Sequence, residues 1–367
     1  MKIIGSFTVI AVSIGRVLIC FLIIFPPFLV NANDYYLAVD GSDSNSGNID
    51  SPWKTITKAI SHLKAGDNLY LRGGTYIGEP TYYWDAKKHP GGISGKPITI
   101  RAYRDENPVF DGQGEMKGFI SLYGVDWVTI EGLTIKNYLV EDNGVIWLGR
   151  LNLKSNDFAE NISIINNRIE NSGKGKRAHA IYVSWGSKDI LIKNNHIKKV
   201  SGYGVHGWHG PGVNGMKIIN NIIQNAKAGA IILADGAKNI EIRNNIIYNN
   251  ATGIDFNHKG SDISWGVKNA KVTRNIIVNC KDYGGLRIAT HNQKDVFSDY
   301  NLYYNAPIIW NGERLSLDEY RKVSNNADHS KVADPLFIDP AQDDFHFQPG
   351  SPAKEILQNT SGLEAAD

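Results

Sequence analysis

The chain has 367 residues, of which 42% are apolar and 21% are charged. This composition provides ample material for a folded core and excludes widespread disorder, which requires low hydrophobicity and a high net charge. The formal net charge is only +2, so the chain as a whole lacks the strongly basic character of a nucleic-acid-binding protein. Its two cysteines exclude a disulfide framework and a four-thiolate zinc site.

Residues 1–32 have the features of a secretory signal peptide. The segment carries two cations and no acid, and its apolar stretch 17–30 is followed by Asn31 and Ala32, where a signal peptidase could cut. We therefore expect cleavage after Ala32, a secreted or periplasmic protein, and no membrane segment in the mature chain. The alternative is an uncleaved anchor, although Arg16 and the pair Pro26-Pro27 would interrupt a membrane-spanning helix.

The part of the chain from 128 to 303 consists of repeats. Each repeat alternates β-branched and polar residues, continues with a polar corner and ends with a short apolar run. Alternation with a period of two indicates half-buried strands, and Asn side chains that stack from one repeat to the next can form a hydrogen-bonded ladder. The recurring Asn of the corner lies at positions 167, 195, 221, 245, 275 and 301.

These repeats predict an all-β fold, a single-stranded right-handed parallel β-helix, with residues 33–367 forming one domain. A coil of this kind cannot bury its own apolar face, so successive coils must stack. A leucine-rich repeat is excluded because the leucine scaffold is missing, and a propeller would need longer units of antiparallel strands. Most repeats should contain a second strand, at 180–184, 204–208, 230–234, 253–257 and 285–289.

The two ends of such a solenoid need a cover. Ser51 and Pro52 predict the start of a cap helix over 51–65, because Ser favours the N-cap and Pro the first turn. At the other end, residues 315–367 should close the solenoid with a short helix at 315–323 and a final strand.

Five segments at the two ends resemble a known group of proteins; they are 36–47, 51–56, 65–76, 333–337 and 348–353. They are similar to the corresponding parts of secreted bacterial β-helix proteins. These include polysaccharide lyases of pectate lyase family nine and of the chondroitinase B and alginate lyase family six type. The resemblance implies calcium, an acidic glycan and a basic residue that abstracts the proton at carbon five of a uronate. The clustered calcium-binding Asp residues near a catalytic Lys, typical of pectate lyases, are not evident in this sequence.

Candidate site residues fall into columns along the second strands. Because side chains alternate between the two faces of a strand, one set should point outward and stack from coil to coil. This outward column consists of Tyr182, His206, Ile232, Asp255 and Arg287. A neighbouring column and the positions just after the strands add Ser184, Trp208, Asn257, Trp185, His209, Asp235, His258 and His291.

The residue types on this face fit more than one reaction. For a β-elimination, the candidate catalytic residues are His206, His209 and Lys259 as the base, Tyr182 and Tyr203 as the acid, and Arg287 as the partner of a substrate carboxylate. The candidate substrate-binding residues are Trp185, Trp208, Asn257, His258 and His291. Asp235 and Asp255 could instead be the carboxylate pair of a glycoside hydrolase, or ligands of Ca²⁺ or of a transition metal.

We therefore expect a secreted enzyme that acts on an acidic polysaccharide, and more specifically a polysaccharide lyase. The alternatives are a glycan-binding or cell-surface β-helix protein without activity, and a glycoside hydrolase that uses Asp235 and Asp255. Calcium is the cofactor that the resemblance suggests. A monomer is expected, with a polysaccharide and not a nucleic acid as its partner.

Overall fold

The computed structural model describes residues 8–14, 17–23, 32–78, 81–150, 157–210, 212–256, 266–289 and 295–357. The chain divides into two compact units, Met1–Ala32 and Asn33–Asp367. In the first unit, β1 (Thr8–Ile14) and β2 (Val17–Ile23) form an antiparallel hairpin. No helix in the described ranges is long and apolar enough to cross a membrane. Residues 24–31, just before the expected cleavage point, lie outside these ranges, and cleavage stays a prediction.

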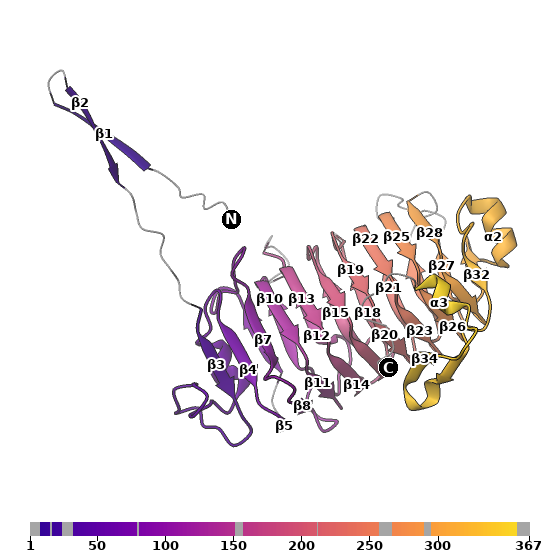
Figure 1. Ribbon diagram of the computed structural model, residues 1–367, viewed down its shortest axis with the longest axis horizontal. Coiled ribbons are helices and arrows are strands. Elements are labelled where there is room, and N and C mark those ends of the chain that lie inside the picture. Colours follow the sequence, from indigo (N-terminus) through magenta and orange to yellow (C-terminus); the bar gives the residue numbers. More distant parts are fainter. Residues whose placement is uncertain are drawn as a thin grey trace. The chain divides into compact units, whose positions relative to one another are not determined.

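The second unit is a parallel β-helix, as the repeats predict. The chain visits three sheets in turn and then begins the next coil, so that strands pair in parallel with their equivalents on the neighbouring coils. The exception is β31 (Glu313–Leu315) at the end of the third sheet, which pairs antiparallel with β30 (Ile308–Trp310). Among the described residues each sheet has ten strands. Figure 1 shows these strands stacked side by side from the indigo N-terminal coils to the orange and yellow C-terminal ones.

The three sheets are named here by the order in which the chain meets them. The first sheet contains β3 (Asp34–Leu37), β4 (Asn68–Leu71), β7 (Ile98–Ala102), β10 (Asp126–Glu131), β13 (Glu160–Ile165), β16 (Leu191–Lys193), β19 (Lys217–Ile219), β22 (Lys238–Arg243), β25 (Lys268–Thr273) and β28 (Val296–Asp299). The second sheet contains β5 (Gly74–Ile77), β8 (Pro108–Asp111), β11 (Thr134–Lys136), β14 (Arg168–Ser172), β17 (His196–Val200), β20 (Ile222–Gln224), β23 (Ile246–Tyr248), β26 (Ile276–Val278), β29 (Leu302–Tyr304) and β32 (Lys331–Val332). The third sheet contains β6 (Tyr82–Asp85), β9 (Ile120–Tyr123), β12 (Gly144–Gly149), β15 (His179–Ser184), β18 (Tyr203–Trp208), β21 (Gly229–Leu233), β24 (Ile254–Phe256), β27 (Leu286–Ile288), β30 (Ile308–Trp310) and β31 (Glu313–Leu315).

Two consecutive Asn residues, such as Asn220 and Asn221, form corners between the first and second sheets, and the two residues differ in role. The first Asn, for example Asn220 with φ 56°, adopts the left-handed backbone that Asn tolerates, and so turns the chain. The second Asn points inward and binds the next coil. Asn195 Nδ2 donates to Asn221 Oδ1 at 3.0 Å, and Asn221 Nδ2 donates to Asn245 Oδ1 at 3.0 Å. The same bond joins 167 to 195, 245 to 275 and 275 to 301, so the predicted ladder is present.

Aliphatic side chains from all three sheets fill the interior. Ile181, Ile231 and Ile254 of the third sheet are fully buried, as the alternation predicts. Not every Ile of these strands lies in the core. Ile165 pairs with Glu131 and Lys193 on the outward face of the first sheet and is only half-buried.

The predicted N-terminal cap helix is much shorter than expected. The structure has a single turn, α1 (Ile56–Ile60), whose N-cap is Thr55 and not Ser51. The residues before it stay extended, because the Trp53 backbone N–H donates to Tyr36 O at 2.9 Å and its carbonyl accepts from Ala38. Asp43 then accepts from the backbone N–H groups of Lys54 and Thr55, which leaves no room for an earlier helical turn.

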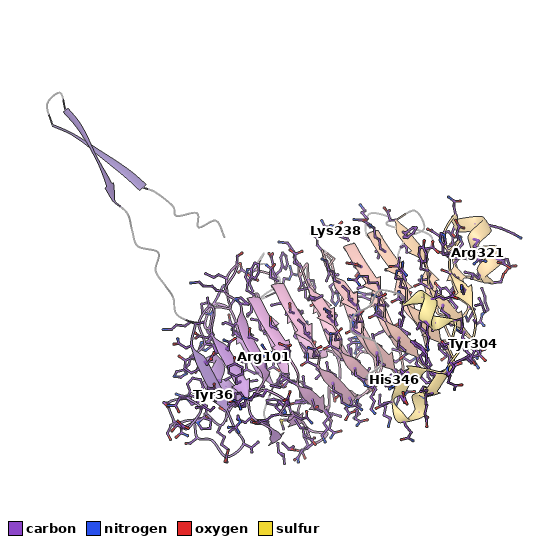
Figure 2. The ribbon with its side chains drawn as sticks, viewed as in Figure 1. Tyr36, Arg101, Lys238, Tyr304, Arg321 and His346 are labelled. Atoms are coloured by element: carbon purple, nitrogen blue, oxygen red, sulfur yellow. The ribbon has the colours of Figure 1, made fainter. Side chains whose placement is uncertain are left out.

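The C-terminal segment packs on the second sheet. After α2 (Leu317–Ser324), which has a capping box, come the hairpin β33 (Phe337–Asp339) and β34 (Asp344–Phe347), a short 3₁₀ turn (Pro340–Gln342) between them, and α3 (Ala353–Ile356). Phe337 and Phe345 pack against side chains of β23, β26 and β29. Asp343 accepts from Arg168 at 2.8 Å and Lys198 at 2.6 Å, which fastens the hairpin to the sheet. Figure 2 shows His346 on this segment, and Tyr36 and Arg101 on the coils at the opposite end of the solenoid.

Candidate functional site

The strand register of the third sheet brings the predicted outward column together. Tyr182 pairs with His206, His206 with Ile232, Ile232 with Asp255, and Asp255 with Arg287. The column also continues toward the N-terminus, because Trp147 pairs with Tyr182. We call this set of residues, Trp147, Tyr182, His206, Ile232, Asp255 and Arg287, the third-sheet column. Since neighbouring coils lie ~4.8 Å apart, the column spans several sugar units.

The third-sheet column faces outward, yet much of it is covered. Tyr182 is 6% exposed and Asp255 only 1%. Pointing outward therefore does not leave these two side chains exposed to solvent. Neighbouring rings supply much of the cover: Tyr182 stacks on His206 with centroids 4.9 Å apart, and the Trp208 ring meets His206 edge-on at 5.2 Å. Functional groups in such a setting are partly desolvated, which strengthens their electrostatic interactions with a bound ligand.

His206 is held by a second histidine, which was not among the predicted site residues. His179, 3% exposed, begins the same strand as Tyr182, and its Nε2 lies 2.6 Å from His206 Nδ1. The other ring nitrogen of His179, Nδ1, accepts the backbone N–H of Tyr203 at 3.1 Å. His179 is a neutral imidazole, because burial lowers its pKa to about 3. Its single proton must then be on Nε2, pointing at His206 Nδ1.

This chain of hydrogen bonds fixes the tautomer of His206. Nδ1 of His206 accepts the proton of His179, so the neutral ring carries its own proton on Nε2. Burial lowers the pKa of His206 well below its usual value, which keeps the ring neutral. Its Nε2 is buried and has no hydrogen-bond partner among the described residues. In this tautomer His206 presents a hydrogen-bond donor at Nε2, and its role as the base stays a prediction.

His209 lies one position beyond the end of β18 and remains the better candidate for the base. Its ring stacks on Trp185 at 4.6 Å between centroids, and it is half-buried. Burial lowers the pKa of His209, while the charge of Asp235 raises it. The imidazole is therefore mostly neutral at neutral pH and able to accept a proton.

The backbone at three successive corners of this face is unusual. Trp185, His209 and Asp235 occupy equivalent places in neighbouring coils, and all are left-handed, with φ of 58°, 72° and 51°. A bulky Trp rarely adopts this conformation, whereas His and Asp tolerate it better. The guanidinium of Arg150 lies 4.2 Å above the Trp185 ring, so a cation, an indole and an imidazole form one stack.

A second polar group lies two coils from His206. Asp255 Oδ2 accepts from Arg287 Nη1 at 3.3 Å, whereas Asp255 Oδ1 is buried without a partner in the described structure. Burial raises the pKa of Asp255 to about 6, against the opposing effect of Arg287. Tyr203 approaches this pair by crossing Gly229, where a Cβ would come within 2.7 Å of the Tyr203 ring. Burial, with the charge of Asp255, raises the pKa of Tyr203 to about 12, so its phenol keeps its proton.

Calcium at Asp255 stays a prediction, since Asn257 and His258 just after it lie outside the described residues. Calcium binds several oxygen ligands and favours ionised carboxylates. Asp255 instead faces the guanidinium of Arg287 and has a raised pKa. No three His, Cys, Asp or Glu side chains gather as a metal cluster in the part of the chain that the structure describes.

Four of the predicted residues lie outside the described residues: Asn257, His258, Lys259 and His291. The described candidates all lie on the third sheet or directly after its strands. Trp208 follows Ser184 in the register, as the second column predicted. Three further residues of this face were not predicted from the sequence: Trp147, Arg150 and His179. The alternation that revealed the column also gives Trp147, because Ile146 and Leu148 beside it are buried.

Comparison with known proteins agrees with this architecture. Residues 35–207 match the family described as a Pel9A-like, right-handed β-helix region. The resemblance to polysaccharide lyases of β-helix fold is confirmed. The chain is 25% identical to the protein YwoF of Bacillus subtilis over 89% of this chain and 93% of that one. It is 38% identical to pectate lyase PEL9 of Emericella nidulans over 99 residues, which are 27% of this chain and 23% of the relative.

A solved structure of a glycoside hydrolase superposes with a TM-score of 0.54 at 10% identity, over 77% of this chain and 95% of that one. At this identity the likeness shows the fold alone. The relatives and neighbours thus include pectate lyases and a glycoside hydrolase on the same scaffold. Because one fold supports different reactions, the choice between them depends on the side chains of the site.

Proposed function

We propose that the protein is an exported polysaccharide lyase that cleaves an acidic polysaccharide by β-elimination at the third-sheet column. The observation that carries this proposal is the buried Nε2–H of His206, which has no partner among the described residues and lies on a face lined with aromatic rings. A fixed neutral imidazole donor is suited to an oxygen that becomes more negative during the reaction. The carboxylate of a uronate is such an oxygen when the proton at carbon five leaves.

The other residues then divide the remaining work. His209 accepts the proton from carbon five, and the electron pair left behind forms the carbon four–carbon five double bond as the glycosidic oxygen leaves. That oxygen takes a proton from a phenol, Tyr182 or Tyr203, whose raised pKa keeps it protonated until then. Arg287, with its guanidinium still partly exposed, attracts the carboxylate of a neighbouring sugar. Trp185 and Trp208 provide stacking surfaces for sugar rings.

A screen of the purified protein against polygalacturonate, alginate, sulfated glycans and neutral glycans tests this proposal. Products should be followed both by the ultraviolet absorbance of unsaturated sugars and by new reducing ends. A lyase gives both signals on a polyuronate. Binding to a polyuronate without either signal would contradict the proposal and favour a glycan-binding β-helix.

A glycoside hydrolase is the second candidate, because Asp255 has the raised pKa expected of a general acid. Its partner would be Asp235, one coil earlier, as the carboxylate that activates water. The ion pair of Asp255 with Arg287 counts against this role, because the guanidinium favours the ionised carboxylate, whereas a general acid must carry a proton. New reducing ends without ultraviolet absorbance in the same screen would select the hydrolase.

A further inference from the structure

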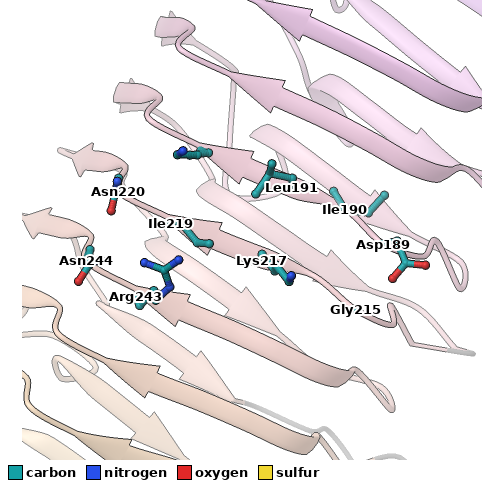
Figure 3. A pocket seen from close by; sticks show the side chains of 10 residues that line it. Asp189, Ile190, Leu191, Gly215, Lys217, Ile219, Asn220, Arg243 and Asn244 are labelled. Carbon is teal, nitrogen blue, oxygen red and sulfur yellow. The ribbon is translucent and has the colours of Figure 1, made fainter. Parts of the chain in front are cut away.

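The first sheet carries a hollow of about 540 Å³ that lies apart from the third-sheet column. It extends over β16, β19 and β22. Figure 3 shows Lys217, Ile219 and Arg243 on its floor, with Asn220 and Asn244 at the corner on one side and Asp189 on the other. The register places Lys193, Ile219 and Arg243 in one outward column on three successive coils. We call this hollow the first-sheet trough.

The cations of the trough differ from others on the same sheet. Arg101 pairs with Glu131 at 3.5 Å, and Lys188 pairs with Glu160, so these cations are neutralised by the neighbouring coil. Within the described residues, neither Lys193 nor Lys217 has a carboxylate at ion-pair distance. Arg243 contacts Glu241 through Nε at 2.6 Å. Asp189 is the remaining acid of the lining. Glu241 is the register partner of Lys217 but bonds to Arg243, so within the described residues the ammonium groups of Lys193 and Lys217 have no ion-pair partner beside the apolar Leu191 and Ile219.

The corner of the trough adds two hydrogen-bond acceptors without partners. Asn220 is 8% exposed and Asn244 is 3% exposed. Both line the trough, and the side-chain Oδ1 of each lacks a hydrogen bond in the described structure. Asn194 Oδ1 at the same corner one coil earlier also lacks a partner in the described structure, although it does not line the trough. A buried polar atom without a partner costs free energy, so this row of oxygens on successive coils needs an explanation. A ligand with hydroxyl groups would provide one.

We infer that the first-sheet trough is a second binding site for an acidic polysaccharide, separate from the catalytic face. The ligand must combine negative charge for Lys193 and Lys217 with hydroxyl donors for the amide oxygens of Asn220 and Asn244. A simple anion lacks the donors, and a neutral sugar lacks the charge. A uronic acid has both, and its C–H face can lie on Ile219. Coils ~4.8 Å apart offer these groups at a spacing suited to consecutive sugars of one chain.

The test compares two double variants that remove the same charge from the same sheet. Lys193→Ala/Lys217→Ala removes both ammonium groups of the trough. Lys238→Ala/Lys268→Ala removes two exposed lysines just outside it. Binding is measured by electrophoresis through gels that contain polygalacturonate, alginate, dextran sulfate or neutral galactan. We expect the trough variant to lose about tenfold in affinity for a polyuronate and the matched control less than about twofold, because specific ion pairs outweigh general attraction.

A third variant tests the acceptors without changing the charge. Asn220→Gly/Asn244→Gly keeps the left-handed corners, which Gly adopts freely, but removes both amide oxygens. We expect weaker binding of polyuronate and unchanged binding of dextran sulfate. Equal loss in the trough and control lysine variants, or no loss in either, would overturn the inference. A preference for dextran sulfate over both polyuronates would overturn the assignment of a uronate.

The identity of the polymer rests on the proposed function, but the two can fail separately. If the trough variants turn over short oligosaccharides like the wild type yet bind the polymer less tightly, the trough is a binding site only, as inferred. If the wild type turns over no polyuronate but still binds one through the trough, the proposed function fails and the inference stands.

Discussion

The two ring nitrogens of His179 decide what His206 can do. Nδ1 of His179 accepts the Tyr203 backbone N–H, which leaves Nε2 to donate to His206. His179 is thus a positioning residue that acts through His206. His179→Leu removes both hydrogen bonds, and we expect kcat to fall by ~10–10² because the His206 donor loses its orientation.

His179→Gln is the matched conservative variant. Its amide oxygen can accept from Tyr203 while its amide nitrogen donates to His206, so it should recover much of the lost kcat. Nitrogen-15 spectra of the histidines should show His206 protonated at Nε2 in the wild type and a mixture of tautomers in His179→Leu. A wild-type spectrum with the proton on Nδ1 would contradict this account.

Asp255 should make stability depend on pH. Its pKa is raised to about 6 in the folded protein from an ordinary 3.8, so folding favours the protonated acid. The contribution of Asp255 to the free energy of unfolding is fully present below pH ~4 and is lost as the pH rises through ~6. Arg287 and Tyr203 are the groups that face this carboxyl. Asp255→Asn removes this dependence, and its Tm relative to the wild type should rise between pH 4 and pH 7. A constant difference in Tm over this range would contradict the raised pKa.

At the scale of the element, the Asn ladder is the main device that joins coils at the corner. Asn221 donates to Asn245 Oδ1 and to the carbonyls of Ile192 and Ile219, and it is fully buried. We expect Asn221→Ala to lower the free energy of unfolding by ~2–4 kcal/mol, because several buried partners lose their hydrogen bonds.

Asn249→Gly is the control for the ladder. Asn249 is exposed and has a left-handed backbone with φ 53° that Gly tolerates, and its side chain donates to Asn225 Oδ1. Its loss should cost less than ~1 kcal/mol in chemical denaturation. A similar loss of unfolding free energy in the two variants would show that the ladder stabilises the fold no more than an exposed corner bond does.

The strands were predictable because alternation and the Asn spacing repeat at every coil. The same regularity gave the register of the column from Tyr182 to Arg287. The cover over Asp255 was not predictable, since it depends on rings such as Tyr203 that reach across from a neighbouring coil. The contact between His179 and His206 was also hidden, because it joins residues 27 apart through side-chain rotamers that no pattern fixes. The predicted start of the cap helix was wrong, because the extended pairing of Trp53 with the strand before it outweighed the capping preference of Ser51.

At the scale of the molecule, the solenoid divides its faces among different tasks. The C-terminal segment covers the second sheet, while the third sheet carries the proposed catalytic residues and the first sheet the trough. An acidic polymer held on the trough would raise the local concentration of substrate for the third sheet, as linked binding sites do. Export of the chain, as 1–32 predict, would bring it to such polymers.

The most direct test of the central claim is the turnover of a polyuronate by His209→Ala, followed by ultraviolet absorbance at saturating substrate. We expect kcat to fall by ~10²–10⁴, the usual effect of losing a positioned base, with little change in Tm. His346→Ala is the control, because His346 is an exposed histidine of the C-terminal hairpin, and it should keep wild-type kcat. Full activity of His209→Ala on a polyuronate that the wild type cleaves would contradict the assignment of catalysis to the third sheet.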